Sequence, residues 1–225
     1  MSGVGHGVVS SDPDDAARRA RTEQRSRQLL DAAARVLERE GSQAVSMQAI
    51  AAEAEVSVGL IYRYFGGKDE LLLAVILDVL DDFATTVPTA IEAAGDDPVQ
   101  RLAAAFRAYC EVIDRHRHAT LLTYRESKSL DPAGRERIKH LEVETSQPLV
   151  EVLREGIEAG VLRPVEPELV AYNLLLTAHA WALKHWYFER TLGFEDYVRS
   201  QLSLVLHGLI QPRQRRRYAG LLEPA

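Results

Sequence analysis

The sequence predicts an all-α protein, because helix-like patterns account for almost every segment. Apolar residues recur at three- and four-residue steps along most of the chain, the spacing that places them on one face of a helix. Helix-start signals precede these runs, among them the pairs Asp97-Pro98 and Asp131-Pro132. No stretch of useful length alternates apolar and polar side chains as a half-buried strand does. We therefore expect about nine helices.

Each expected helix has an apolar stripe together with a start or stop signal. Ser46 and Ser57 are the N-caps of two short helices, and the pair Gly66-Gly67 ends the second of them. Gly160 ends a later run, which Pro148 is expected to kink. The expected helices, in order, cover residues 23–40, 47–54, 58–65, a long helix from 68 toward Pro88, then 98–115, 119–127, 132–159, 166–190 and 194–210.

Composition and charge narrow the class of protein. The chain has a single cysteine, Cys110, so it has no internal disulfide framework, which fits a reducing cytoplasm. No apolar run is long enough to span a bilayer, and no signal peptide is visible, so we expect a cytoplasmic protein without a membrane partner. The net charge is −6, yet residues 18–68 hold nine Lys or Arg against six acidic side chains. A basic segment on an acidic body is the asymmetry expected when one part meets phosphate.

The helices at 47–54 and 58–65 form a helix-turn-helix braced by the helix before them. Ile61 and Phe65 lie four residues apart and can anchor the second helix to the core. Side chains at 58, 59, 62 and either 63 or 64 then point outward. Tyrosine hydroxyls bond phosphate oxygens, and Lys68 stands at the next helix N-terminus, where the helix dipole and the ammonium both attract an anion. This stretch is therefore typical of a helix that lies across a DNA groove.

Residues 24–72, with AVSMQAIAAEAEVSVGLIYRYFGGKDELL at their centre, resemble the DNA-binding domain of the TetR family of bacterial repressors. Glu55 departs from the family pattern, which has glycine in the turn, and is expected to strain it; Leu60 departs where threonine is frequent. Tyr62 and Tyr64 could instead pack against the first helix, and the arginines at 18–27 could be a solvated run or a DNA-binding arm. The resemblance implies operator contacts at Ser46, Gln48, Val58, Gly59, Leu60, Tyr62, Tyr64 and Lys68.

The resemblance also implies that the C-terminal helices bind a small molecule and form a homodimer. The helices at 166–190 and 194–210 are apolar on more than one face, which favours a two-fold four-helix interface over a monomeric core. The segment Tyr124-Arg125-Glu126 is similar to segments of TetR-type regulators of acyl-CoA metabolism, although Arg125 could simply pair with Glu126. The expected domains are a disordered tail at 1–17, the helix-turn-helix domain at 18–67, the ligand and dimerisation domain at 68–211, and a C-terminal tail at 212–225. Candidate ligand contacts are Phe106, Tyr109, Leu121, Tyr124, Arg125 and Trp181, with Cys110 and Trp186 as further candidates.

Catalytic and metal-binding patterns are missing from the sequence. No metalloprotease, nucleophile-elbow, dinucleotide or phosphate-loop motif is present, so we expect neither an enzyme nor a cofactor. The histidine pairs His116/His118 and His179/His185 have spacings that suit no shared metal. The sequence therefore predicts a repressor that binds double-stranded operator DNA and is released by an apolar effector such as an acyl chain, fatty acid or acyl-CoA. Open alternatives are a multidrug-responsive repressor of an efflux gene, a nucleoid-type or activating DNA-binding protein, and an enzyme or carrier built on the C-terminal bundle.

Overall fold

The computed structural model describes residues 13–40, 46–128 and 130–223, and every named element in them is a helix. The all-α class is thus confirmed, and Leu162 and Ile210 form only an isolated bridge. The described part contains eleven α-helices and one 3-10 helix, because three short elements near the C-terminus were not expected from the sequence as helices of their own. The elements are α1 Pro13–Glu40, α2 Met47–Glu53, α3 Val58–Phe65, α4 Lys68–Ala93, α5 Pro98–Arg115, α6 Arg117–Glu126, α7 Pro132–Glu158, α8 Pro167–Leu183, α9 His185–Phe188, α10 Phe194–Leu209, η1 Pro212–Tyr218 and α11 Ala219–Leu222.

Helix starts lie where the capping residues predicted them. The side chains of Ser46 and Ser57 accept backbone N–H groups at the starts of α2 and α3. Asp97 and Asp131 do the same for α5 and α7, each followed by proline at the first helical position. These caps satisfy donors that a helix N-terminus otherwise leaves unpaired.

The first helix begins earlier than expected. Helix α1 starts at Pro13, so residues 13–17, expected in a disordered tail, are helical, and the arginines at 18–27 belong to the same helix rather than to a separate arm. Proline at a first helical position with Asp14 and Asp15 after it is a favourable helix start, and this signal is present in the sequence. Residues 1–12 of the expected tail lie outside the described residues.

Two prolines stand inside helices. Helix α4 continues through Pro88 to Ala93, and α7 continues through Pro148. Pro88 removes the donor for the carbonyl of Ala84, but Ala84 is exposed, so water can satisfy that carbonyl. The expectation that the long fourth helix runs only toward Pro88 is therefore wrong.

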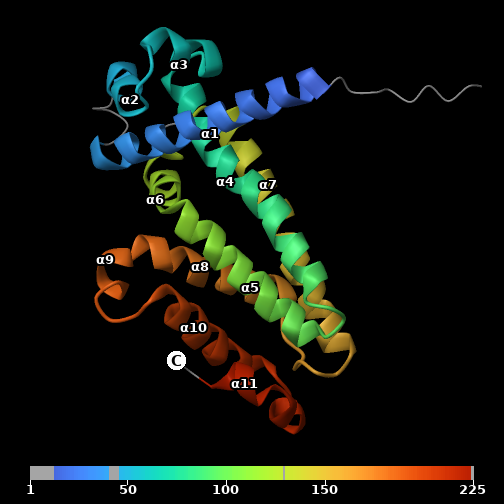
Figure 1. Ribbon diagram of the computed structural model, residues 1–225. Coiled ribbons are helices and arrows are strands. Elements are labelled where there is room, and N and C mark those ends of the chain that lie inside the picture. The colour runs from blue at the N-terminus through green and yellow to red at the C-terminus, as the bar shows by residue number, and fades with distance from the viewer. Residues whose placement is uncertain (1–12, 41–45, 129, 224–225) are drawn as a thin grey trace, which may run out of the picture.

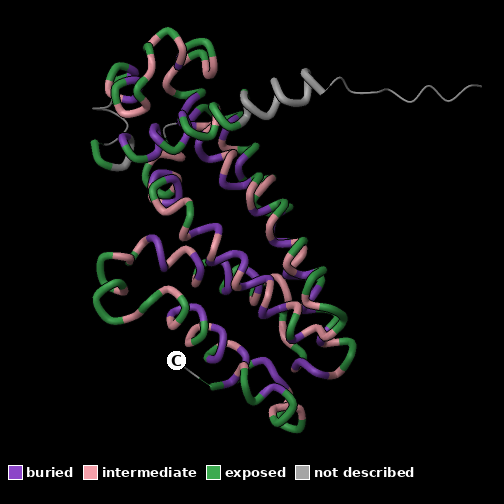
Figure 2. The backbone as a smooth tube through the Cα atoms, viewed as in Figure 1, coloured by how far each residue is buried: buried purple, intermediate pink, exposed green. Residues whose placement is uncertain are grey.

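The helices form a small N-terminal unit on a larger bundle (Figure 1). Helices α1, α2 and α3 share a core with the first turns of α4, in which Ile50, Ile61 and Leu71 are fully buried. The rest of α4 leads into the bundle, where it packs beside α5 and α7, and α5 in turn packs on α8. Buried residues follow the inner faces of these helices, and exposed ones lie on the outer side of α3 and on the outer loops (Figure 2). Helix α4 thus belongs to both units and connects them.

The C-terminal segment is part of the bundle. The expected helix at 166–190 is divided, because α8 ends at Leu183 and α9 is a separate short helix. Beyond α10, the hydroxyl of Tyr218 donates to Asp97 Oδ2 at 2.9 Å, and Arg217 Nη2 donates to the same oxygen at 2.7 Å. Tyr218 and Leu222 are buried, so this segment is anchored to the bundle and is not a free tail. Among the described helices, none is long and apolar enough to cross a membrane.

Candidate functional site

The turn between α2 and α3 is a helix C-cap of the Schellman type with Glu55 at its left-handed position. The N–H of Val56 donates to Ala51 O at 2.9 Å, and the N–H of Glu55 donates to Ala52 O at 3.2 Å, the two bonds that define this cap. Glu55 has φ of 54°, where a Cβ is crowded and glycine is favoured. The strain expected from a glutamate at this turn is therefore visible in the backbone.

Helix α3 buries one face and exposes the other. Ile61 is fully buried, whereas Tyr62 is 50% exposed and Arg63 and Gly59 are exposed. Tyr64 differs from the expectation that it points outward, because it is half-buried and packs against the core beside Phe65, with ring centroids 6.1 Å apart. Val58, also expected outside, is half-buried against the same core. Tyr62 is thus the most exposed aromatic side chain of this helix.

Helix α2 is fixed to α1 by an ion-pair network. The Glu53 carboxylate accepts from Arg35 Nε at 3.1 Å and from Arg39 Nη1 at 3.3 Å. Hydrogen bonds from Arg35 and then Arg39 hold the pKa of Glu53 below its usual range. Ser46 and Gln48, at the start of α2, are exposed. The network links α2 to α1 at the surface, while the buried side chains Met47, Ile50 and Ala51 hold α2 in the core.

The end of α3 leads directly to the positive end of α4. Gly66 has φ of 84°, and its N–H donates to Tyr62 O at 2.8 Å, so the backbone turns sharply there. Lys68 is the first residue of α4 and is half-buried, like Leu60. A helix N-terminus with an ammonium beside it attracts anions. Of the eight expected DNA contacts, four are exposed and four are half-buried, and all lie on α2, α3 or the starts of α2 and α4 at one end of the molecule (Figure 1).

A cavity of about 320 Å³ lies between the helices of the C-terminal bundle and is open to the surface, since Tyr124, Tyr172 and Leu176 of its wall are exposed. Its wall is mostly apolar and aromatic, with a few hydroxyls, one carboxylate and one imidazole, which is the composition typical of a site for an apolar small molecule. Five helices contribute to the wall: α4, α5, α6, α7 and α8. The lining residues are Leu80, Phe83, Tyr109, Thr123, Tyr124, Ser127, Glu142, Thr145, Tyr172, Leu175, Leu176 and His179.

Hydrogen bonds hold two of the cavity tyrosines in place. The hydroxyl of Tyr109 donates to the backbone carbonyl of Thr145, and its ring lies 4.6 Å from that of Phe83, centroid to centroid. The hydroxyl of Tyr124 lies 2.8 Å from Nδ1 of His179, and the two rings meet edge to face at 5.6 Å. Tyr109 therefore forms a fixed part of the wall, whereas the pair of Tyr124 and His179 connects α6 to α8.

Burial controls the charges around the cavity. It lowers the pKa of His179 to about 4, so the imidazole is neutral at physiological pH. It raises the pKa of Glu142, and burial followed by the nearby Glu142 charge raises the pKa of Tyr124. The cavity therefore holds one acidic group whose charge is disfavoured and no positive charge among its lining residues.

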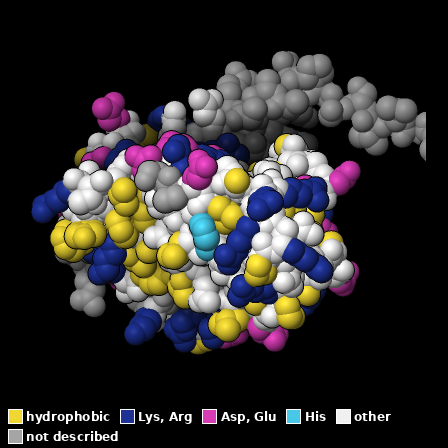
Figure 3. Space-filling view, turned by 90° about the horizontal axis from the view of Figure 1, so that it is seen from below, with side chains coloured by type: hydrophobic (Ala, Val, Ile, Leu, Met, Phe, Trp, Pro, Cys, Tyr) yellow, Lys and Arg dark blue, Asp and Glu magenta, His cyan; other side chains and the backbone are white. Residues whose placement is uncertain are grey.

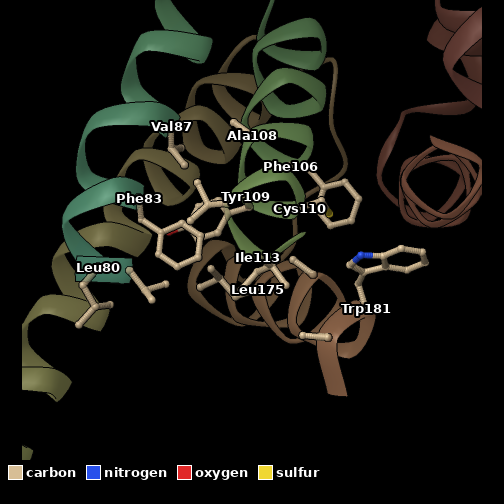
Figure 4. Close-up of a cluster of buried hydrophobic side chains, with 14 of the residues drawn as sticks. Leu80, Phe83, Val87, Phe106, Ala108, Tyr109, Cys110, Ile113, Leu175 and Trp181 are labelled. Atoms are coloured by element: carbon tan, nitrogen blue, oxygen red, sulfur yellow. The ribbon is translucent and has the colours of Figure 1, made fainter. Parts of the chain in front are cut away.

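The expected ligand contacts are not all brought together. Tyr109 and Tyr124 line the cavity, but Phe106 and Trp181 lie on the other side of α5 (Figure 4). Phe106 is fully buried core, and the Trp181 indole donates to Asp114 at 2.7 Å. Apolar periodicity shows that a helix is buried, but it does not show which of two interiors a side chain faces.

The two other expected contacts, Leu121 and Arg125, line a separate groove together with Trp186. The further candidate Cys110 is buried in the core.

Sequence reasoning missed His179 and Glu142 as cavity residues. The available signal was on α8, where Tyr172, Leu176 and His179 recur at helical spacing. Within the described ranges, no group of three or more His, Cys, Asp or Glu side chains is placed to hold a metal ion.

Large apolar side chains are exposed on α8, α9 and α10. Leu169, Tyr172 and Leu176 form a stripe on α8, and they are 61%, 42% and 55% exposed. Leu204 on α10 is 71% exposed. Seen from below, hydrophobic side chains form a broad patch on the side where α9 lies in Figure 1, and Lys or Arg side chains gather on the other side (Figure 3). Exposed apolar patches of this kind are typical of protein interfaces.

Comparisons with known proteins agree with this architecture. A family model described as bacterial regulatory proteins, tetR family, matches residues 29–75, and one described as Tetracyclin repressor-like, C-terminal domain, matches residues 95–209. The chain is 40% identical over 184 residues to the HTH-type transcriptional regulator HbdR of Aromatoleum sp. (strain CIB), covering 82% of this chain and 80% of that protein. It is 27% identical over 187 residues to the HTH-type transcriptional repressor KstR2 of Mycolicibacterium smegmatis, covering 82% of this chain and 90% of the relative.

Solved structures show the same fold. The TetR family regulator PfmR from Thermus thermophilus superposes with a TM-score of 0.71 at 26% identity, covering 81% of this chain and 99% of that one. AibR in complex with isovaleryl coenzyme A and operator DNA superposes with a TM-score of 0.68 at 25% identity, covering 81% and 97%. Both family models match, one on the helix-turn-helix unit and one on the C-terminal bundle, and a relative is 40% identical over most of the chain. The chain therefore belongs to the TetR family of bacterial DNA-binding transcriptional regulators.

Proposed function

We propose that the protein is a homodimeric repressor that binds operator DNA through two copies of α3 and releases it when a coenzyme A thioester with an apolar acyl group enters the bundle cavity. The observation that carries this proposal is the apolar cavity, one wall of which is α6, the helix that packs against α1. A molecule in the cavity thus contacts an element that touches the DNA-binding unit. AibR, solved with isovaleryl coenzyme A and operator DNA, and the repressor KstR2 support the same class of function.

An apolar acyl group suits the cavity because its wall offers mainly aromatic and aliphatic surface. Leu80, Phe83 and Leu175 are buried side chains of this wall and would cover a hydrocarbon on several sides. Each buried methylene contributes about 0.8 kcal/mol to binding. Affinity should therefore rise with acyl length until the cavity is full.

A thioester suits the cavity better than a free fatty acid. Glu142 is an acidic side chain of the wall, and a free carboxylate beside it would add a like charge to a partly buried site. A thioester is uncharged, and its carbonyl can accept a hydrogen bond from the Tyr124 hydroxyl once that hydroxyl no longer bonds His179 Nδ1. The cavity therefore favours the thioester of an acid over the acid itself.

The route from the cavity to the DNA passes along α6. Thr123 and Tyr124 line the cavity, and the same helix packs against α1. At its start, His116 Nε2 lies 2.9 Å from Asp82 Oδ2 on α4, the helix that begins at Lys68. A shift of α6 would thus move both α1 and α4, and the two recognition helices of a dimer would lose the spacing of two half-sites about one DNA turn apart.

The dimer in this proposal forms through the exposed stripe of α8 and the outer face of α10. Leu176 and Leu204 are each more than half exposed in the single chain. A second copy would cover these side chains symmetrically, as a two-fold interface requires.

The test is operator release measured by fluorescence anisotropy with a duplex that the protein selects from a random pool. Titration with butyryl-, hexanoyl- and octanoyl-CoA should release the duplex at successively lower concentrations, and the matching free acids should act more weakly. Equal potency of all three thioesters, or no release by any of them, would contradict the proposal.

A second candidate effector is a lipophilic cation, and Glu142 in an aromatic cavity is the observation that favours it. Tyrosine faces and a carboxylate together attract an organic cation. The same assay with a cationic dye distinguishes the two, because Glu142→Gln should weaken release by the dye and leave release by a thioester intact or improved.

A further inference from the structure

A second hollow of about 460 Å³ lies outside the cavity, between α6 and the end of α8 with α9. Its lining differs from the cavity wall, because it includes two arginines and two histidines. Trp186, which is 59% exposed, stands beside them. The lining residues are Arg117, His118, Leu121, Arg125, Ala182, Leu183, His185, Trp186 and Glu189.

The groove combines two features that recognise a nucleotide. Arg117 and Arg125 supply guanidinium groups, which match the geometry of phosphate oxygens. The exposed indole of Trp186 offers a flat face on which a base can stack. Arg117 is held in position because its guanidinium contacts the His185 ring and lies 3.7 Å from Asp114 Oδ1. Glu189 is the one acidic side chain among the lining residues, and it lies 3.4 Å from the His185 ring, away from Arg125 in the sequence.

The groove and the cavity share two walls. On α6, Tyr124 lines the cavity and the next residue, Arg125, lines the groove. On α8, His179 lines the cavity and Leu183, four residues later, lines the groove, which is about 6 Å of helix rise. The two hollows are therefore neighbours along both helices, and a ligand with one end in each would run between α6 and α8.

We propose that this groove binds the phosphorylated nucleotide end of a coenzyme A thioester, with the base against Trp186 and the phosphates at Arg117 and Arg125, while the acyl group occupies the cavity. This assignment rests on the proposed function, and it deepens it by giving the two ends of one effector separate sites. It explains how an effector with several negative charges binds a protein whose cavity has no positive side chain.

The experiment compares two thioesters that share an acyl group and differ in the nucleotide. Dissociation constants of hexanoyl-CoA and of S-hexanoyl-pantetheine are measured by calorimetry with the full chain and with Trp186→Ala and Arg117→Gln. The matched control is Tyr187→Phe, because Tyr187 is 53% exposed on the same short helix, does not line the groove and keeps its ring beside Trp186 after this change. Adenosine 3′,5′-bisphosphate alone is a third ligand, and sedimentation reports the oligomeric state of each variant.

We expect the wild-type chain to bind hexanoyl-CoA at least about tenfold more tightly than the pantetheine thioester, given the usual gain from stacking one base. Trp186→Ala and Arg117→Gln should remove most of that difference and leave the affinity for the pantetheine thioester unchanged, and Tyr187→Phe should change neither affinity. Equal affinity of wild type for both thioesters would overturn the groove assignment and leave the proposed effector class standing. Binding of neither thioester would overturn both. If adenosine 3′,5′-bisphosphate binds as tightly as hexanoyl-CoA does, the groove is a site for a free nucleotide. If the Trp186→Ala variant is a monomer while the wild type is a dimer, Trp186 belongs to the dimer interface. Either result contradicts the proposal.

Discussion

The hydroxyl of Tyr124 lies 2.8 Å from Nδ1 of His179, and this hydrogen bond joins α6 to α8 across the wall of the bundle cavity. The imidazole is mostly enclosed by protein, and the two rings also meet edge to face. In the proposed mechanism, a molecule in the cavity displaces this pair. The position of α6, and through it of α1, would then depend on what the cavity holds.

Tyr124→Phe should lower the free energy of unfolding by about 1 kcal/mol, because it removes the hydrogen bond and leaves the His179 nitrogen without that partner. It should also change the effector concentration needed for operator release. Thermal unfolding and the anisotropy assay check the two effects, with Tyr187→Phe on the surface as the matched control. An unchanged melting temperature and unchanged release would show that the bond has no role.

The pKa of His179, lowered to about 4 by burial, makes stability depend on pH. The folded pKa lies below the unfolded value, so between pH 6.5 and 4 the unfolded chain binds more protons and folding stability is lost as pH falls. His179→Gln should reduce the decrease in the free energy of unfolding between neutral and acid pH by on the order of 2 kcal/mol. Chemical unfolding at pH 7.5 and pH 4.5 measures it.

Glu142→Gln is the control for that pH prediction. The pKa of Glu142 is raised, so this group favours the folded state at low pH and its contribution is lost as pH rises. Glu142→Gln should therefore leave the decrease in the free energy of unfolding at low pH as large as in the wild type, or larger. If the free energy of unfolding depends less on pH in Glu142→Gln than in His179→Gln, the decrease in stability at low pH does not come from His179.

Leu176→Asp and Leu204→Asp should each convert a dimer to a folded monomer, because both side chains are exposed in the single chain. Leu175 and Leu202 are only 8% exposed, so Asp at either position would unfold the bundle instead of testing the interface. Val143→Asp on α7 is the control, since Val143 is 47% exposed on another helix. Sedimentation and circular dichroism distinguish the outcomes, and a wild-type monomer at micromolar concentration would rule out the proposed dimer.

Two backbone positions should respond in opposite directions to mutation. Glu55→Gly should stabilise the protein by up to about 1 kcal/mol, because glycine has no Cβ to crowd at φ of 54°. Gly66→Ala should destabilise it by about 1 kcal/mol, because φ there is 84°. Urea titration measures both changes, and the same sign in both variants would contradict the assigned backbone conformations.

Tyr62→Phe should weaken operator binding by about 1 kcal/mol for the lost hydrogen bond to phosphate, and Lys68→Ala should reduce the salt slope by roughly one per monomer. Arg216→Ala removes the same charge from an exposed position on η1, at the far end of the molecule, and controls for net charge. Anisotropy at several salt concentrations gives both quantities. Equal slopes in Lys68→Ala and Arg216→Ala would remove Lys68 from the interface.

Local signals in the sequence were sufficient for the DNA-binding unit. The caps Ser46 and Ser57, the anchor Ile61 and the strained Glu55 all act within a few residues, so their effects can be predicted without knowing the fold. Tyr64 shows the limit, because its packing depends on how α3 is rotated against the core.

The cavity was harder to predict because it is formed between helices. Trp181 and His179 are two residues apart on α8, yet the indole joins an aromatic cluster with Phe188, Phe194 and Tyr197 and the imidazole faces the cavity. Both look like buried residues of an apolar helix. Only the packing of α5 against α8 separates the two interiors.

The central claim, that effector and operator compete through the conformation of the bundle, has one direct test. The dissociation constant of hexanoyl-CoA is measured by calorimetry with the full chain, first alone and then with saturating operator duplex. Coupling between two sites is reciprocal, so the operator should weaken thioester binding by the same factor by which the thioester weakens operator binding, at least about tenfold. Identical thioester affinity with and without the operator would contradict the account.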